Sequence, residues 1–278
     1  MIRTIQGQTV GSTNPDSHGE RYDRAFWEDF LSAMPARAPL HQEHDMSRPI
    51  CGHMENFRLQ PDPEHLGEWL VVCDVTYDDE KVVDPRAGAF SWSATVRMAS
   101  NTEDCHTFVY LPYPYYNDAD LLQAILLHDD SLGVGKWLKK KLDPTEVGLI
   151  IASATLVLGP AWTAIYNNTI HPQFTRLFAR CKDLLWSRGV STDLIQACMI
   201  PHNNRRVALN FVPTRGAEEA CFSQERIVEA IELARIELES DWGQHHEEVD
   251  RLVLLFDDAR QAYKIDRIHY ANGKVRPL

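Results

Sequence analysis

The chain has 278 residues, of which 44% are hydrophobic and 24% are charged, as is typical of a folded globular protein. That length accommodates two compact units, or one large core with an appended helical section. The formal net charge of −12 opposes a phosphate backbone and the longest basic run is Lys139–Lys141, so a broad nucleic-acid-binding surface is not expected.

Residues 1–39 are expected to form an arm with one short helix. Residues 1–20 are polar and rich in turn residues. Between residues 21 and 34 the apolar side chains recur at helical spacing, and the face they define consists of Tyr22, Phe26, Phe30 and Leu31.

From residue 40 to residue 117 the sequence predicts a small β-rich domain. Four segments are rich in β-branched and aromatic residues or alternate between polar and apolar residues, namely 54–59, 68–77, 91–98 and 107–111. Acidic and proline–glycine stretches between them indicate short turns, including one at 78–80.

Residues 118–190 are expected to be helical. A helix is predicted over 118–127, and another begins at Asp143, which is followed by Pro144 and Glu146 in a helix-start pattern. The window 147–170 carries no formal charge, and the helical pattern resumes after it through Trp186.

The apolar window 147–170 has two interpretations. As a membrane-inserted or membrane-docked segment it is near the required length, and Lys139–Lys141 precede it as cytoplasmic-side charges do. As a buried helical hairpin it is divided by Gly159-Pro160, and the roughly 15 residues before that break span only about 22 Å. The proline break and the short length favour the buried hairpin, and membrane docking stays open as the alternative.

Residues 191–278 predict a C-terminal α/β unit with an antiparallel or mixed sheet. Strands are expected at 194–200, 207–212, 251–256 and 262–270, with a helix over 223–239. The last strand ends at the turn Asn272-Gly273. The fold class is therefore α+β.

Six cysteines are scattered singly, without a C-x-x-C pair or a secretory leader, and they are Cys51, Cys73, Cys105, Cys181, Cys198 and Cys221. This distribution indicates reduced thiols in a cytoplasmic protein. A metal site is not expected, because the histidines at 41, 44 and 53 match no fixed zinc spacing. The glycine pair in 133–136 lacks the context of a phosphate loop and is interpreted as a helix boundary, and no cofactor is expected.

A short set of motifs runs through the β-rich segment. His44-Asp45 precedes Pro49-Ile50, and the stretch GAFSWSATV, which contains Ser91, follows after two predicted strands. Over about residues 40–117 this order resembles the phage prohead (capsid maturation) serine proteases, whose fold is shared with the herpesvirus assemblins. The resemblance implies a partly open β-barrel.

The resemblance also implies a His-Ser-His type site. His44 corresponds to the general base and Ser91 to the nucleophile, with Ser93 as the nearby competitor, and the third member corresponds to His106 in the stretch DCHTFVYLPYP. A serine hydroxyl needs an imidazole within hydrogen-bond reach to take its proton, and a third group to fix the tautomer of that imidazole.

The sequence therefore supports two functional hypotheses. The first is a serine peptidase-like protein that acts on a protein partner. The second is a non-catalytic interaction or membrane-docking effector, for example in a bacterial or phage assembly or defence complex, that uses a degenerate assemblin-like domain and the window 147–170. Both predict an oligomer or a subunit of a larger complex.

Overall fold

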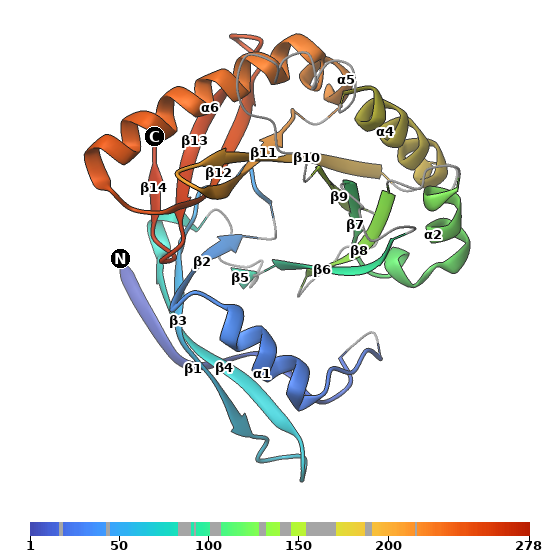
Figure 1. The fold of residues 1–278 in the computed structure, drawn as a ribbon. Coiled ribbons are helices and arrows are strands. Elements are labelled where there is room, and N and C mark those ends of the chain that lie inside the picture. Colours follow the sequence, from blue (N-terminus) through green and yellow to red (C-terminus); the bar gives the residue numbers. More distant parts are fainter. Residues whose placement is uncertain are drawn as a thin grey trace. The chain divides into compact units, whose positions relative to one another are not determined.

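In the computed structural model the chain forms two β-sheets accompanied by helices (Figure 1). Contacts divide it into a first unit, Met1–Trp92 with Ala271–Val275, and a second unit, Ser93–Tyr270 with Arg276–Leu278. The residues that the structure describes, in several strands by their backbone only, are 1–16, 19–42, 45–82, 90–91, 93–100, 107–127, 132–139, 146–153, 171–186, 191–214 and 216–278.

The first unit contains a five-stranded antiparallel sheet in the order β1-β4-β3-β2-β5. Its strands are β1 (Ile2–Ser12), β2 (Arg37–Gln42), β3 (Gly52–Pro61), β4 (Trp69–Asp78) and β5 (Phe90–Ser91). A short 3-10 helix, η1 (Asp79–Lys81), follows β4.

Helix α1 (Arg24–Ala33) covers one face of the first sheet. The Asp23 carboxylate accepts a hydrogen bond from the Phe26 backbone N–H at 2.8 Å and so caps the helix. Trp27 is 4% exposed and packs in a cluster with alternate residues of the strands, among them Leu40, Met54 and Cys73. This alternation leaves the other residues of each strand on the opposite face.

The second unit contains a nine-stranded mixed sheet in the order β14-β13-β12-β11-β10-β9-β7-β8-β6. Its strands are β6 (Ser93–Ser100), β7 (Thr107–Leu111), β8 (Leu132–Lys139), β9 (Glu146–Ser153), β10 (Ser191–His202), β11 (Arg205–Val212), β12 (Val249–Asp257), β13 (Ala262–Tyr270) and β14 (Val275–Pro277). The pairs β7–β8, β9–β10 and β11–β12 are parallel.

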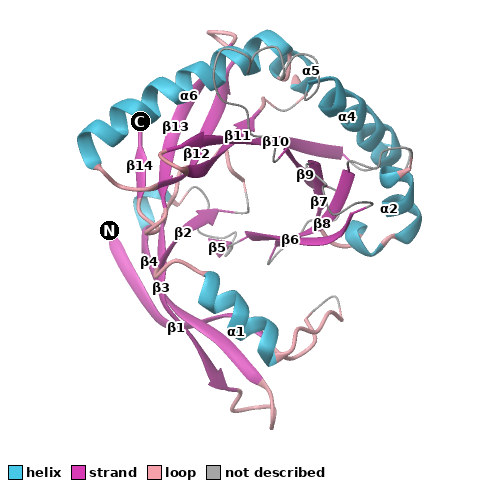
Figure 2. Ribbon diagram, viewed as in Figure 1, coloured by secondary structure: helices cyan, strands magenta, loops and turns pink. Residues whose placement is uncertain are grey.

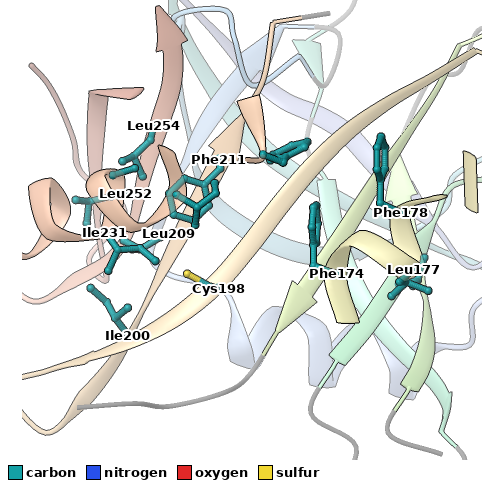
Figure 3. Close-up of a cluster of buried hydrophobic side chains, with 14 of the residues drawn as sticks. Phe174, Leu177, Phe178, Cys198, Ile200, Leu209, Phe211, Ile231, Leu252 and Leu254 are labelled. Carbon is teal, nitrogen blue, oxygen red and sulfur yellow. The ribbon is translucent and has the colours of Figure 1, made fainter. Parts of the chain in front are cut away.

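Helices α2, α4 and α6 lie on one side of the nine-stranded sheet (Figure 2). The helical elements of this unit are η2 (Tyr115–Asn117), α2 (Ala119–Leu126), α4 (His171–Trp186), α5 (Glu218–Cys221) and α6 (Gln224–His245). Figure 3 shows Phe174 and Phe178 of α4 and Ile231 of α6 among the strand residues of one hydrophobic core. The mixed α+β class expected from the sequence is confirmed.

The prediction of a central helical hairpin is wrong for its first part. Residues Glu146–Ser153 form β9, which pairs with β10 on one side and with β7 on the other. An interior strand of a helix-covered sheet has a continuous run of apolar residues, which resembles a buried helix in the sequence. Val147, Ile150 and Ile151 are β-branched, as is typical of strands. The predicted helix start at 143–144 and the rest of the window, 154–170, lie outside the described residues.

The structure also bears on the membrane interpretation. Among the helices of the described ranges, none combines the length and the apolar character needed to cross a bilayer. The part of the window that is described, β9, is an interior strand of the nine-stranded sheet.

Two further segments differ from the prediction because of their glycines. The predicted N-terminal arm contains β1, whose ladder with β4 shifts register between Ile5 and Gln8 and again between Thr9 and Gly11. Gly7, with a φ of +65°, lies within the first shift.

The segment 133–136 lies in β8, between β6 and β7, and is not a helix boundary. Glycines at bulges and in interior strands resemble turn signals in a sequence.

The two sheets cross the domain boundaries that the sequence suggested. Residues on both sides of position 39 form β2, and the arm contributes β1 to the same sheet as β3 and β4. Strands β6 and β7, expected in a domain ending at 117, join the sheet that contains β8 to β13. The C-terminal strands and helix were predicted in their observed order.

Candidate functional site

The predicted catalytic residues are described only in part. His44 and His106 lie outside the described residues, and Ser91 is described by its backbone. Ser91 is the second residue of β5, which pairs with β2 in the register Ser91 opposite His41 and Phe90 opposite Gln42. The competitor Ser93 begins β6, in the second unit. The ladder therefore brings His41 and Ser91, 50 positions apart in the sequence, into direct register.

Strand β2 turns His41 away from the hydrophobic core. Its burial alternates strictly: Ala38, Leu40 and Gln42 are buried on the α1 side, whereas His41 lies on the opposite face and is half-buried. The Gln42 side-chain amide donates to the Lys81 carbonyl at 2.9 Å and to the Pro49 carbonyl at 3.3 Å. These bonds anchor the end of β2 and with it the face that His41 occupies.

We call this opposite face of the first sheet the polar face, and its residues on β2, β3 and β4 are Arg37, His41, His53, Glu55, Asp74 and Thr76. Pro39 of β2 is opposite His53, and Arg37 is opposite Glu55. On β4, Thr76 is opposite His53 and Asp74 is opposite Glu55. Five titratable or cationic side chains thus share one side of three neighbouring strands.

His53 is held in its neutral form on the polar face. The Arg37 Nη2 atom lies 2.7 Å from His53 Nδ1, and because a guanidinium only donates, Nδ1 accepts and the ring proton resides on Nε2. His53 Nε2 faces Glu55 Oε2 at 3.7 Å. Burial lowers the pKa of His53 below its ordinary value, and the positive charge of Arg37 lowers it further.

Asp74 is fixed as a carboxylate at the far end of the polar face. It accepts hydrogen bonds from the Gly7 backbone N–H at 2.9 Å and from the Asn56 side-chain amide at 3.0 Å. These two bonds lower its pKa, and nearby Arg58 adds to the effect. Among the described residues, no group of three or more His, Cys, Asp or Glu side chains is placed to hold a metal ion.

A second polar group, the Asp241 cluster, lies in the second unit and consists of Glu237, Asp241, Tyr270 and Arg276. The Asp241 side chain is completely buried, and its Oδ1 atom accepts from the Tyr270 hydroxyl at 2.6 Å and from Arg276 Nη2 at 2.7 Å. Arg276 Nη2 also donates to Glu237 Oε1 at 2.8 Å. This cluster joins α6 to β13 and β14 and is a structural clamp.

Comparisons with family models, with curated proteins and with solved structures find no match for this chain. The chemistry of the polar face is therefore considered from its own residues. Sequence reasoning weighed His41 and His53 only as metal ligands. The alternation of RAPLHQ indicates that His41 lies on the side of β2 opposite the buried residues.

Proposed function

We propose that the protein is a serine peptidase-like hydrolase that acts on a protein partner, with Ser91 as its nucleophile. The pairing of β2 with β5 is the observation that supports this proposal. It sets the strand that carries Ser91 beside the strand that runs toward His44, two residues beyond the end of β2 at Gln42. In the proposed site His44 is the base and His106 orients it, within a domain similar to an assemblin barrel.

The proposed reaction needs a neutral imidazole beside the serine hydroxyl. The hydroxyl oxygen attacks the carbonyl carbon of a peptide bond while its proton passes to the imidazole. The resulting imidazolium gives that proton to the departing amine, and water then releases the acyl group from the serine by the same steps.

A second candidate function is a non-catalytic protein-binding module. It is favoured by the surface of α6, where Leu233 is 39% and Ile236 is 65% exposed, three residues apart and so on one side of the helix. Exposed apolar side chains near one another on a helix are a feature of protein-binding surfaces. Membrane docking through residues 146–153 is not part of this candidate, because they form an interior strand.

A fluorophosphonate probe, which phosphonylates activated serines with loss of fluoride, separates the two functions. We expect the full-length wild-type protein to be labelled and Ser91→Ala to lose the label, whereas Ser93→Ala retains it. Mass spectrometry of the peptide that contains Ser91 identifies the adduct. Labelling of the wild type that is no greater than that of Ser91→Ala or of the urea-unfolded protein contradicts the hydrolase and leaves the binding module.

A further inference from the structure

We propose that the outer side of α6 is the docking site for an amphipathic α-helix of a partner protein, one that carries lysine or arginine beside its apolar stripe. This inference rests on the protein-binding candidate function and names the class of partner. It does not involve Ser91, so its outcome and that of the proposed hydrolase are independent.

Helix α6 has apolar residues on two sides. Its inner side is buried against the nine-stranded sheet (Figure 1) and consists of Ile227, Ala230, Ile231, Ala234 and Leu238. A helix that only covers a sheet needs one apolar stripe, which these residues supply. Leu233 and Ile236 lie outside that stripe and are exposed. They therefore form a second apolar side that the packing of α6 on its own sheet does not use.

The exposed residues on this second side have the spacing of a helix–helix interface. We call Leu233, Ile236, Ser240 and Gly243 the outer seam; they are exposed and follow one another at intervals of three, four and three residues, the a/d spacing of a heptad. Ser240 and Gly243 are small, and nothing lies within 4 Å of a Cβ atom added at Gly243. A second helix can thus place apolar side chains on Leu233 and Ile236 and approach closely beyond them.

Glutamates adjoin the outer seam. Glu232 and Glu239 directly precede Leu233 and Ser240, and Glu229 lies one turn before Leu233. The first two occupy heptad g positions, where charges select the partner and its orientation. Over the whole of α6, six carboxylates stand against two arginines. A helix with basic residues beside its apolar stripe is the complement of this surface.

The same charges disfavour a second copy of this chain as the partner. Two copies joined through the outer seam would bring two acidic helices together, and like charges across an interface are destabilising. Arg235 offsets part of the charge, since its Nη1 atom lies 3.1 Å from Glu232 Oε2 and its Nη2 atom 4.0 Å from Glu239 Oε1. Exposed pairs of this kind contribute little, so lysines of a partner can replace Arg235 at these carboxylates.

The docking site is tested with a fluorescent synthetic peptide of about four heptads that has Leu and Ile at a and d and Lys at e and g. We expect the full-length protein to bind this lysine peptide in fluorescence anisotropy. Because each apolar side chain contributes buried area, Leu233→Ser and Ile236→Ser should each weaken binding by about tenfold or more. Leu127→Ser, which changes an exposed leucine outside α6, is the matched control and should stay within about twofold of the wild type.

Two further peptides separate docking from general attraction to an acidic chain. One has the composition of the lysine peptide in scrambled order, and the other has Glu in place of Lys at e and g. Equal binding of either one overturns the proposal, as do equal affinities of the wild type and the two seam variants, or no binding of the lysine peptide.

Sedimentation equilibrium tests the second copy as occupant. A wild-type dimer that Ile236→Ser converts to a monomer shows that the outer seam pairs with itself, and it also overturns the proposal. A monomeric wild type that binds the lysine peptide supports it. Fluorophosphonate labelling of Ser91 is measured separately, so a failed peptide experiment leaves the proposed hydrolase intact, and a failed labelling experiment leaves the docking site intact.

Discussion

A single buried carboxylate connects three elements of the second unit. Asp241 of α6 is fully enclosed, and a buried charge is tolerated only when donors replace the water it has lost. Tyr270 of β13 and Arg276 of β14 supply those donors. Within the described part of the chain, the second carboxylate oxygen, Oδ2, has no hydrogen-bond partner, so the two bonds to Oδ1 carry the stabilisation.

Replacing Tyr270 by phenylalanine tests this residue-scale interpretation. A hydrogen bond to a charged group contributes about 1.5 to 3 kcal/mol, so we expect Tyr270→Phe to lower the free energy of unfolding by that amount. The loss should appear in urea unfolding at neutral pH as a lower midpoint with an unchanged slope. A variant as stable as the wild type contradicts the role of this hydroxyl.

Tyr270 also makes the stability of the protein depend on pH in a predictable direction. Burial and the hydrogen bond to Asp241 raise the pKa of Tyr270 to about 12, above its ordinary value of 10. The unfolded chain therefore releases this proton first, so the stabilisation is fully present below pH 10 and is lost as the pH rises toward 12. Measured by urea unfolding between pH 10 and 12, the free energy of unfolding should fall more steeply with pH for the wild type than for Tyr270→Phe. Parallel declines in the two proteins would contradict the role of Tyr270 in this pH dependence.

At the scale of elements, the space between β3 and β4 at position 52 accommodates only a glycine. A Cβ atom added at Gly52 would lie 2.0 Å from the Thr76 carbonyl oxygen and 2.7 Å from the Tyr77 Cα atom. Both are backbone atoms of the neighbouring strand, so neither can turn aside. Overpacking of this kind costs about 1 to 3 kcal/mol or more, and we expect Gly52→Ala to lower the free energy of unfolding accordingly.

The matched control is a glycine with free space around it. Gly243 lies in the last part of α6, is exposed, and has nothing within 4 Å of an added Cβ. Because alanine favours a helix over glycine by about 0.5 to 1 kcal/mol, Gly243→Ala should raise the free energy of unfolding. Urea unfolding measures the change in the free energy of unfolding for both variants. Changes in the same direction for Gly52→Ala and Gly243→Ala would contradict the argument from Cβ contacts.

Local patterns predicted many elements well and failed for identifiable reasons. Strands 107–111 and 262–270 have the predicted limits, because each combines β-formers with clear flanking turns. Strand β9 was mistaken for a helix, since a short apolar run has no period that distinguishes an interior strand from a buried helix. Strand β1 was mistaken for a loop because glycines at its bulges resemble turns.

Sequence patterns identified the strand that carries Ser91 but not the residue that pairs with Ser91 in the sheet. The motifs indicated Ser91, but the residue opposite it depends on which strand pairs with β5 and in which register. Strand partners far apart in the sequence leave no local periodicity, so no pattern within 37–42 predicts that His41 pairs with Ser91 in the ladder. The alternation of β2 did predict which of its side chains point away from the core.

At the scale of the whole molecule, the described residues form a hydrophobic cluster in each of the two units. One cluster joins α1 to β1–β4 and includes Leu40, which is 1% exposed. The other joins α2, α4 and α6 to the nine-stranded sheet and includes Leu209, which is fully buried. Since each sheet combines segments from distant parts of the sequence, the boundaries drawn from composition could not match these units.

A hydrophobic cluster in each unit predicts that a core substitution loosens mainly the unit that contains it. Truncation of a buried leucine to alanine costs about 2 to 5 kcal/mol, so both Leu40→Ala and Leu209→Ala should be clearly destabilised. Hydrogen exchange followed by mass spectrometry should show faster exchange in β1–β4 peptides for Leu40→Ala and in β10–β13 peptides for Leu209→Ala. Each variant serves as the control for the other. If either variant accelerates exchange equally in both sets of peptides, the units unfold as one cooperative body, and the division between them does not extend to stability.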